Sequence, residues 1–113
     1  MKTLIASLAL FVSFVAHADQ VITCTGNGES LVVQITSFTD SVTHNGDHFT
    51  DCRRINFTNI VGYDCQDRSK DKAVMLFVHL ENNRPVKGSV SYSEGGTFIG
   101  GPTDGSGIDL TCK

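Results

Sequence analysis

The sequence contains no tryptophan, only two prolines and no excess of basic residues. Its formal net charge at pH 7 is −3, from nine lysines and arginines against twelve aspartates and glutamates. Nucleic-acid-binding domains usually carry a basic patch, so this balance argues against nucleic acid as a partner. With 113 residues, the chain has room for one domain and is too short for two.

Helix-forming residues are also scarce once the first eighteen residues are set aside. Only one alanine, Ala73, and one methionine, Met75, follow residue 18. Apolar residues nowhere recur at three- and four-residue spacing over a helical length. β-Branched residues and eleven glycines are present instead. The sequence therefore predicts an all-β domain.

Residues 1–18 have the features of a cleavable secretory signal peptide. Lys2 supplies a positive start, Leu4 to Val15 form an apolar stretch, and Ala16-His17-Ala18 is a small-residue cleavage site. The apolar stretch is shorter than the ~20 residues that a membrane-spanning helix needs, and no later stretch is long enough for a membrane span. We therefore expect a secreted or periplasmic protein whose single domain covers residues 19–113.

Short alternating runs of apolar and polar residues, separated by glycine and asparagine turns, fill the rest of the chain. They predict a small antiparallel β-sandwich or barrel of about eight short strands. Asn45-Gly46 is the clearest turn, because this pair accepts the positive φ angles of a two-residue hairpin. Ala73–Leu80 is apolar on both faces, which predicts a central strand covered on both sides. The polar segment Asp64–Lys72 is predicted to be an exposed loop.

Four cysteines in a short exported chain favour disulfides, since a small domain has a marginal core. Cys24 and Cys112 lie in threonine-flanked runs near the two ends of the domain, and Cys52 and Cys65 lie 13 positions apart (65 − 52). We expect the pairs Cys24–Cys112 and Cys52–Cys65, although sequence alone leaves the other two connectivities open. Zinc is disfavoured, because its cysteine ligands usually come in pairs two to four residues apart.

Two histidines and two aspartates gather around the predicted hairpin: His44, Asp47, His48 and Asp51. The two-residue turn places His44 opposite Asp47, whereas strand alternation sends His48 to the other face. Two ligands on one face make a weak site, so we expect no metal here and predict an exposed, solvated hairpin tip. The same four residues are the cluster on which a small hydrolase could draw.

The segment Asp67-Arg68-Ser69-Lys70-Asp71 has the alternating oxygen ligands with which many calcium loops begin. The glycine and the glutamate that such a loop needs further on are replaced by Lys72 and Val78. The basic residues between the aspartates would also repel a cation. The segment is therefore predicted to be a charged connection between strands.

The glycine-rich segment Gly95–Gly107 lacks the lysine of a phosphate-binding loop, and no helix follows it. We expect a flexible hairpin and loop there. Phe98 and Ile99 are candidate contact residues if this loop is exposed, and inward packing of both is an equally open alternative. Arg53 and Arg54 point to opposite faces of their run, so they form no common patch.

Catalysis and cofactors find little support, because the chain has no G-x-S-x-G motif and no cysteine that can be assumed free. The function predicted from the sequence is a small exported, non-catalytic binding or inhibitory module that contacts a protein or glycan through loops. The alternatives are the small hydrolase and a structural subunit that pairs through an edge strand. The oligomeric state stays open. The candidate binding residues are His44, Asp47, Asp67, Arg68, Phe98 and Ile99.

Overall fold

The computed structural model describes residues 20–37, 39–99 and 107–113, with the backbone alone at positions 98 and 99. The predicted signal peptide, residues 1–18, lies outside these ranges. The described ranges form ten strands and no helix. The strands are β1 Gln20–Gly26, β2 Glu29–Ile35, β3 Asp40–His44, β4 Asp47–Phe49, β5 Asp51–Asn56, β6 Ile60–Asp67, β7 Lys72–Glu81, β8 Arg84–Glu94, β9 Thr97–Ile99 and β10 Ile108–Cys112.

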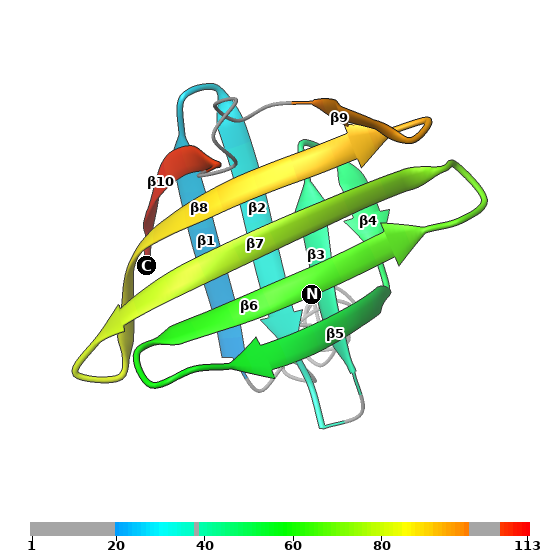
Figure 1. Cartoon of the computed structure of the whole chain (residues 1–113). Coiled ribbons are helices and arrows are strands. Elements are labelled where there is room, and N and C mark those ends of the chain that lie inside the picture. The colour runs from blue at the N-terminus through cyan, green and yellow to red at the C-terminus, as the bar shows by residue number, and fades with distance from the viewer. Residues whose placement is uncertain (1–19, 38, 100–106) are drawn as a thin grey trace, which may run out of the picture.

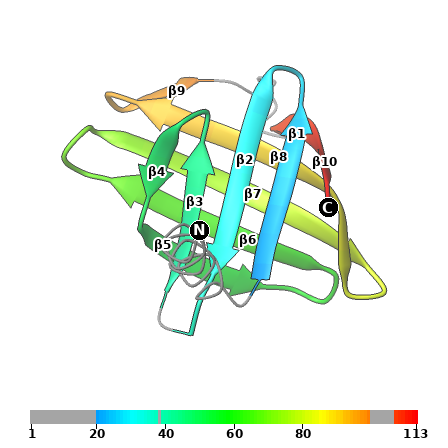
Figure 2. The ribbon, with the colours of Figure 1, turned by 180° about the vertical axis from the view of Figure 1, so that it is seen from behind.

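All strand pairs are antiparallel, and the order across the sheet is β4-β3-β2-β1-β10-β8-β7-β6-β5, with β9 paired to the end of β8. Figure 1 shows β5 to β8 as a front layer that crosses β1 to β4, and Figure 2 shows the same two layers from behind. The sheet curls until β3 contacts β5, which gives a flattened, nearly closed barrel. This confirms the predicted all-β antiparallel fold. The strand number is ten rather than about eight, because β4 and β9 are separate strands of three residues each.

The core fills the space between the two layers. In every long strand alternate side chains point inward, as a pleated strand requires. On β7, for example, Val74, Leu76 and Val78 are buried. The buried apolar side chains that share this interior are Ile22, Leu31, Val33, Val42, Phe49, Tyr63, Val74, Leu76, Val78, Val90 and Leu110, together with three of the four cysteines.

Both disulfides predicted from the sequence are present, and each joins directly opposite residues of neighbouring strands. Cys24 of β1 bonds to Cys112 of β10, and Cys52 of β5 bonds to Cys65 of β6. Gly88 of β8 lies against the first bond: a Cβ atom there would stand 2.9 Å from the Cys112 sulfur. The absence of a side chain at position 88 is therefore what lets β8 pass so close to the disulfide.

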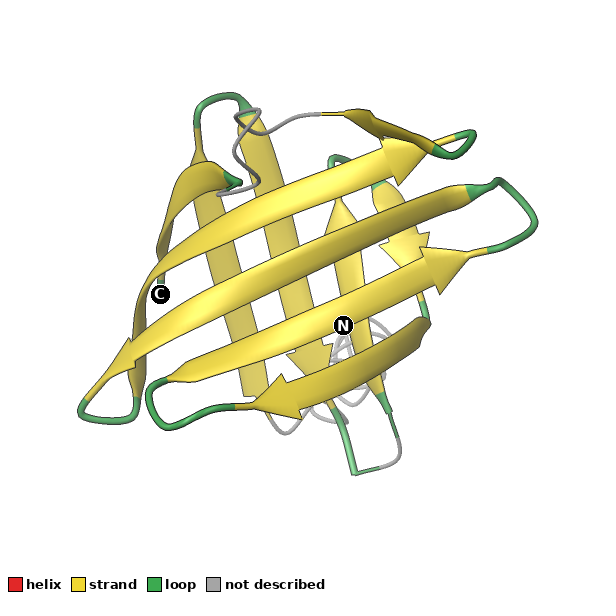
Figure 3. Cartoon of the chain, viewed as in Figure 1, coloured by secondary structure: helices red, strands yellow, loops and turns green. Residues whose placement is uncertain are grey.

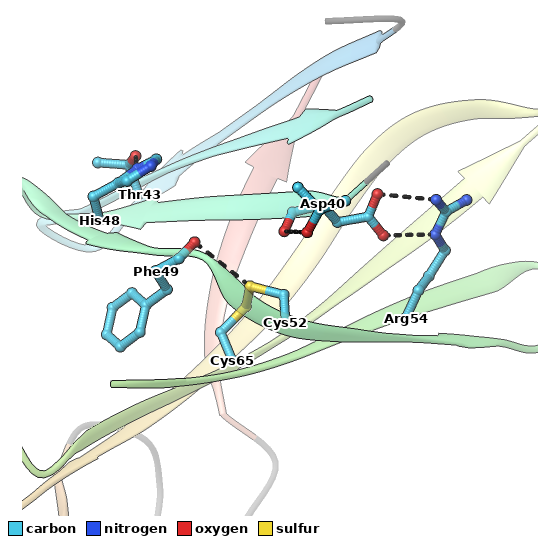
Figure 4. The surroundings of a disulfide bond; sticks show 8 residues. Asp40, Thr43, His48, Phe49, Cys52, Arg54 and Cys65 are labelled. Carbon is cyan, nitrogen blue, oxygen red and sulfur yellow. Dashed lines mark hydrogen bonds and ion pairs between the residues drawn. A yellow bond between two sulfur atoms is a disulfide. The ribbon is translucent and has the colours of Figure 1, made fainter. Parts of the chain in front are cut away.

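The two ends of the sheet meet along a seam between β3 and β5 that side chains hold together (Figure 4). Arg54 donates two hydrogen bonds to the carboxylate of Asp40, of 2.8 Å from Nε and 2.9 Å from Nη2. Nearby, the sulfur of Cys52 lies 3.6 Å from the carbonyl oxygen of Phe49. Arg53 turns to the opposite face and reaches Asp64 at 3.4 Å, as strand alternation predicted.

Two expectations about individual segments were wrong. The polar segment Asp64–Lys72 is not a loop, because β6 continues to Asp67 and β7 begins at Lys72, which leaves only a short turn (Figure 3). Polar outward residues such as Gln66 alternate with buried Cys65, so residues 64–67 are a half-exposed strand, and the exposed connection is confined to the turn over residues 68–71. In addition, β7 is fully buried on one face only: Val74, Leu76 and Val78 are buried, whereas Met75 and Phe77 on the other face are half-buried.

Candidate functional site

Three turns that are far apart in the sequence come together at one end of the barrel. They are the β3–β4 turn at Asn45-Gly46, the β6–β7 turn over residues 68–71 and the β8–β9 turn at Gly95-Gly96, and we call them the turn cluster. The amide of Gly95 donates to the carbonyl of Asp71 at 2.8 Å, which fixes the second turn to the third. The candidate loops named from the sequence therefore share one surface over their described parts.

Lys72 joins all three turns. It begins β7 opposite Glu94 of β8, whose carboxylate lies 3.7 Å from the Lys72 ammonium. The same ammonium donates to Asp47 of β4 at 2.9 Å, across the end of the barrel. The hydrogen bond from Lys72 lowers the pKa of Asp47, and the bond to Asp47 raises the pKa of Lys72. Both groups are thus charged around neutral pH, and the ion pair ties β4 to β7.

The β6–β7 turn is folded by its own side chains. Asp67 accepts hydrogen bonds on Oδ1 from the hydroxyl of Ser69 at 2.6 Å and from its amide at 3.1 Å, a local turn typical of aspartate. The bond from the Ser69 hydroxyl is the main reason that the pKa of Asp67 is lowered. These bonds use the carboxylate oxygen that a calcium loop would offer. Within the described ranges, no three histidines, cysteines or acidic residues are grouped so that they could hold a metal ion.

A polar hollow of about 250 Å³ lies beside this turn. Four of the residues singled out in the sequence line it: His48, Asp51, Asp67 and Arg68. They come from β4, from β5 and from the end of β6 and the turn after it. The β5–β6 hairpin, which pairs Asp51 with Gln66, brings them together. His48 shares a hydrogen bond of 2.9 Å with the hydroxyl of Thr43, on the face opposite to His44.

His44 is not part of a solvated hairpin tip, and this prediction was wrong. Its side chain is buried, with its ring centroid 4.5 Å from that of Tyr92 and its Nε2 3.5 Å from Oε1 of Glu29. Only Asn45 and Gly46 of the turn are exposed. A partner therefore has no direct access to the imidazole, and the His/Asp group proposed for hydrolysis is split between the barrel interior and its surface.

Sequence reasoning missed Glu29, the buried carboxylate beside His44. Asn45 donates to its Oε2 at 2.6 Å and accepts from the amide of Ser30 at 2.8 Å, so this turn residue also joins β2 to the hairpin. Burial raises the pKa of Glu29, but the hydrogen bond from Asn45 and the nearby His44 and Tyr92 outweigh it. The net pKa of Glu29 is lowered. The asparagine of the Asn-Gly turn was the available signal, since it has a side chain that can reach a neighbouring strand.

The remaining candidates, Phe98 and Ile99, lie on β9, whose backbone pairs with Tyr92, Ser93 and Glu94 of β8. Their side chains are outside the described part of the structure, so their role as contacts stays a prediction.

The chain was compared with protein-family models, curated proteins and solved structures, and none of them matches it. No helix in the described ranges has the length and apolar character needed to cross a membrane. The two disulfides are compatible with an oxidising, extracytoplasmic environment.

Proposed function

We propose that this protein is a small exported, non-catalytic binding module that contacts another protein through the turn cluster. The observation that carries the proposal is the fixation of three separate turns to one another by Lys72 and by the Gly95–Asp71 hydrogen bond. Turns that are already ordered lose little conformational entropy when a partner binds, which favours affinity. Binding residues are commonly carried on connecting segments that a rigid scaffold positions.

The charges of the turn cluster favour a protein partner over a glycan. Arg68 and Lys70 lie between Asp67 and Asp71, all within one turn and its flanks. Interspersed charges of both signs can match a complementary pattern on a protein surface, and they set specificity and the rate of association. A glycan site more often offers an exposed aromatic ring, and the described residues of the three turns include none.

The two alternatives draw less support from the described residues. The hydrolase would draw on His44, Asp47, His48 and Asp51. His44 is buried and Asp47 is paired with Lys72, so only His48 and Asp51 remain together, at the polar hollow. The structural subunit would need a long free edge strand, and the edge strands β4 and β9 have three residues each. The longer end strand, β5, faces β3 across the seam.

The test compares two charge reversals at opposite ends of β7. Arg68→Glu changes the turn cluster, and Arg84→Glu changes another exposed arginine, which begins β8 beside the β7–β8 turn at the other end. The residue 19–113 chain, immobilised, is used to capture a partner from the exported fraction, and the purified partner is then titrated by calorimetry. We expect Arg68→Glu to weaken binding by about tenfold or more, ~1.4 kcal/mol, and Arg84→Glu to bind like the wild type.

Equal weakening by both reversals would contradict the placement of the contact surface at the turn cluster. Capture of a polysaccharide that survives protease treatment would replace the protein partner by a glycan. A hydrolytic activity that is lost in His48→Ala and Asp51→Ala, with the fold intact by circular dichroism, would favour the hydrolase.

A further inference from the structure

The outer face of the front layer carries an exposed aromatic side chain far from the turn cluster. Phe57 follows β5 in the β5–β6 turn and is 58% exposed. In the described ranges the other exposed large hydrophobic side chain is Val21, at 46%, on β1 in the opposite layer. A single exposed apolar residue needs no explanation, so the significance of Phe57 depends on what surrounds it.

The register of the front layer places further apolar side chains beside Phe57. Ile60 of β6 lies opposite His79 of β7, and two pairs further along, on the same face, Gly62 lies opposite Phe77. A Cβ atom at Gly62 would be 2.9 Å from the Phe77 ring, so the glycine lets this ring lie down on the sheet. Together these residues make the walls of a hollow of about 350 Å³, lined by Phe57, Ile60, Phe77, His79 and Ser89.

One side of this outer hollow is basic. Lys87 of β8 lies directly opposite His79 on the same face of the sheet, and its side chain is exposed. Within the described residues no ion pair engages Lys87. The carboxylate placed nearest by the register is Asp109 of β10, which lies opposite Ser89, two pairs away from Lys87. The hollow thus has largely apolar walls. Lys87, which does not itself line the hollow, is the cross-strand neighbour of His79 in its wall, on a chain whose net charge is negative.

We propose that the outer hollow binds an amphiphilic carboxylate, such as a fatty acid. Its apolar chain would lie against Phe57, Ile60 and Phe77, where burial removes apolar surface of both partners from water. Its carboxylate would face Lys87 and His79, which can donate charge-assisted and neutral hydrogen bonds. The charge complementarity of the rim favours this anion over an uncharged or cationic amphiphile. The site is distinct from the turn cluster, because Ile60 and Lys87 lie toward the opposite ends of β6 and β8 from that cluster.

The experiment titrates the folded 19–113 chain with dodecanoate, kept below its micelle-forming concentration, and follows backbone amide resonances by NMR. Dodecyltrimethylammonium, with the same chain length and the opposite charge, is the ligand control. We expect dodecanoate to shift the resonances of Phe57, Ile60, Phe77, His79 and Lys87 in a saturable way. The ammonium analogue should bind at least about threefold more weakly, as expected for one exposed charge pair.

Variants then separate the apolar and the charged contributions. Phe57→Ser should weaken dodecanoate binding about tenfold, because a buried phenyl contact is lost, whereas Val21→Ser is the matched change on the opposite layer and should leave binding unchanged. Lys87→Gln should weaken it about threefold, with Lys70→Gln, an exposed lysine of the turn cluster, as the matched control. Asp109→Asn should strengthen it, because a carboxylate near the rim is removed. Thermal melting of each variant shows that the fold is retained.

Several results would overturn the proposal. The first is that dodecanoate and dodecyltrimethylammonium bind with the same affinity. The second is that Phe57→Ser and Val21→Ser weaken dodecanoate binding to the same extent. A monomer–dimer equilibrium in sedimentation that Phe57→Ser abolishes would assign the face to a second copy of the chain. Binding to anionic phospholipid vesicles, without binding of monomeric dodecanoate, would assign it to a membrane surface. None of these results bears on the turn cluster, which is tested by Arg68→Glu.

Discussion

The chain closes on itself in two places that are built differently. Near its termini, β1 and β10 are joined by a backbone ladder and by the Cys24–Cys112 disulfide. At the other closure, β3 and β5 meet without a ladder between the described residues, and the contact depends on the Asp40–Arg54 ion pair. Backbone groups are the same for every residue, whereas an ion pair requires two particular side chains. Provided that the Cys24–Cys112 disulfide is left intact, the seam should therefore be much more sensitive to substitution than the terminal junction.

The seam also depends on how far its charges are removed from water. Asp40 has a side chain that is 7% exposed, whereas that of Arg54 is 41% exposed. The two hydrogen bonds to Asp40 raise the pKa of Arg54. A buried carboxylate that loses its partner is still removed from water, and nothing offsets that free-energy cost. Leaving Asp40 unpaired therefore lowers the free energy of unfolding by more than the ion pair itself contributes.

The largest effect is expected from removal of the terminal junction's disulfide by Cys24→Ala with Cys112→Ala. The bond spans 88 positions, and the entropy of closing so long a loop corresponds to about 4–5 kcal/mol of unfolding free energy. Urea denaturation of the variant, with Cys52–Cys65 intact, measures the loss. A change below about 1 kcal/mol would mean that the backbone ladder alone is sufficient at this junction.

A smaller loss, about 3 kcal/mol, is expected for Cys52→Ala with Cys65→Ala, because that bond closes a loop over only 13 positions. The same urea experiment gives the value. If this loss were the greater of the two, the β5–β6 hairpin next to the seam, rather than the terminal strands, would limit the stability of the barrel.

At the seam itself, Arg54→Met should cost about 1–3 kcal/mol, because it leaves the buried carboxylate of Asp40 without its partner. Arg53→Met is the matched control. The Arg53 side chain is 77% exposed and 3.4 Å from Asp64, and such a surface pair contributes about 0–1 kcal/mol. The double variant Asp40→Asn with Arg54→Met should recover part of the loss. Equal costs for Arg53→Met and Arg54→Met would contradict the assignment of the seam to Arg54.

The smallest expected effect is on stability at acid pH. The lowered pKa of Glu29 means that its contribution to stability is present above its unfolded-state pKa of 4.5 and is lost as the pH falls through the folded-state value. The stability of the wild type should therefore fall more steeply below pH 4.5 than that of Glu29→Gln, as measured by thermal melting across this range. If the wild type and Glu29→Gln gave parallel curves of stability against pH, the ionisation of Glu29 would make no contribution to stability. The terminal ladder and disulfide have no comparable titration.

Much of the fold could be predicted because it follows from local pattern. The Asn45-Gly46 turn and the alternation in the strands follow from residues close in sequence. The pairing of Cys24 with Cys112 was expected from their threonine-flanked runs, but the sequence left the other connectivities open. The neighbour relation of β10 and β8 could not be derived, since no local signal specifies which distant strands meet. The segment around Asp64 was predicted to be a loop, because a strand with one solvent-exposed face has as many polar residues as a loop.

The candidate site was predicted in part. Asp67 and Arg68 do lie in a turn that meets two other turns, but their meeting depends on the lysine that follows them, Lys72, whose reach across the barrel was not apparent from the sequence. His44 was misplaced because its neighbours Glu29 and Tyr92 belong to other strands. Periodicity shows which face of a strand a residue occupies, and it does not show what the opposite layer places there.

The two sulfur bonds are nested, since the Cys24–Cys112 pair encloses Cys52 and Cys65 in the sequence. A chain that crosses a membrane from its N-terminus presents Cys24 first and Cys112 last. An oxidant that joined cysteines in order of arrival would link Cys24 to Cys52. If the chain is exported N-terminus first, the native pairs require either that Cys24 stay reduced until Cys112 has emerged, or that a thiol reshuffle a wrong first bond afterwards.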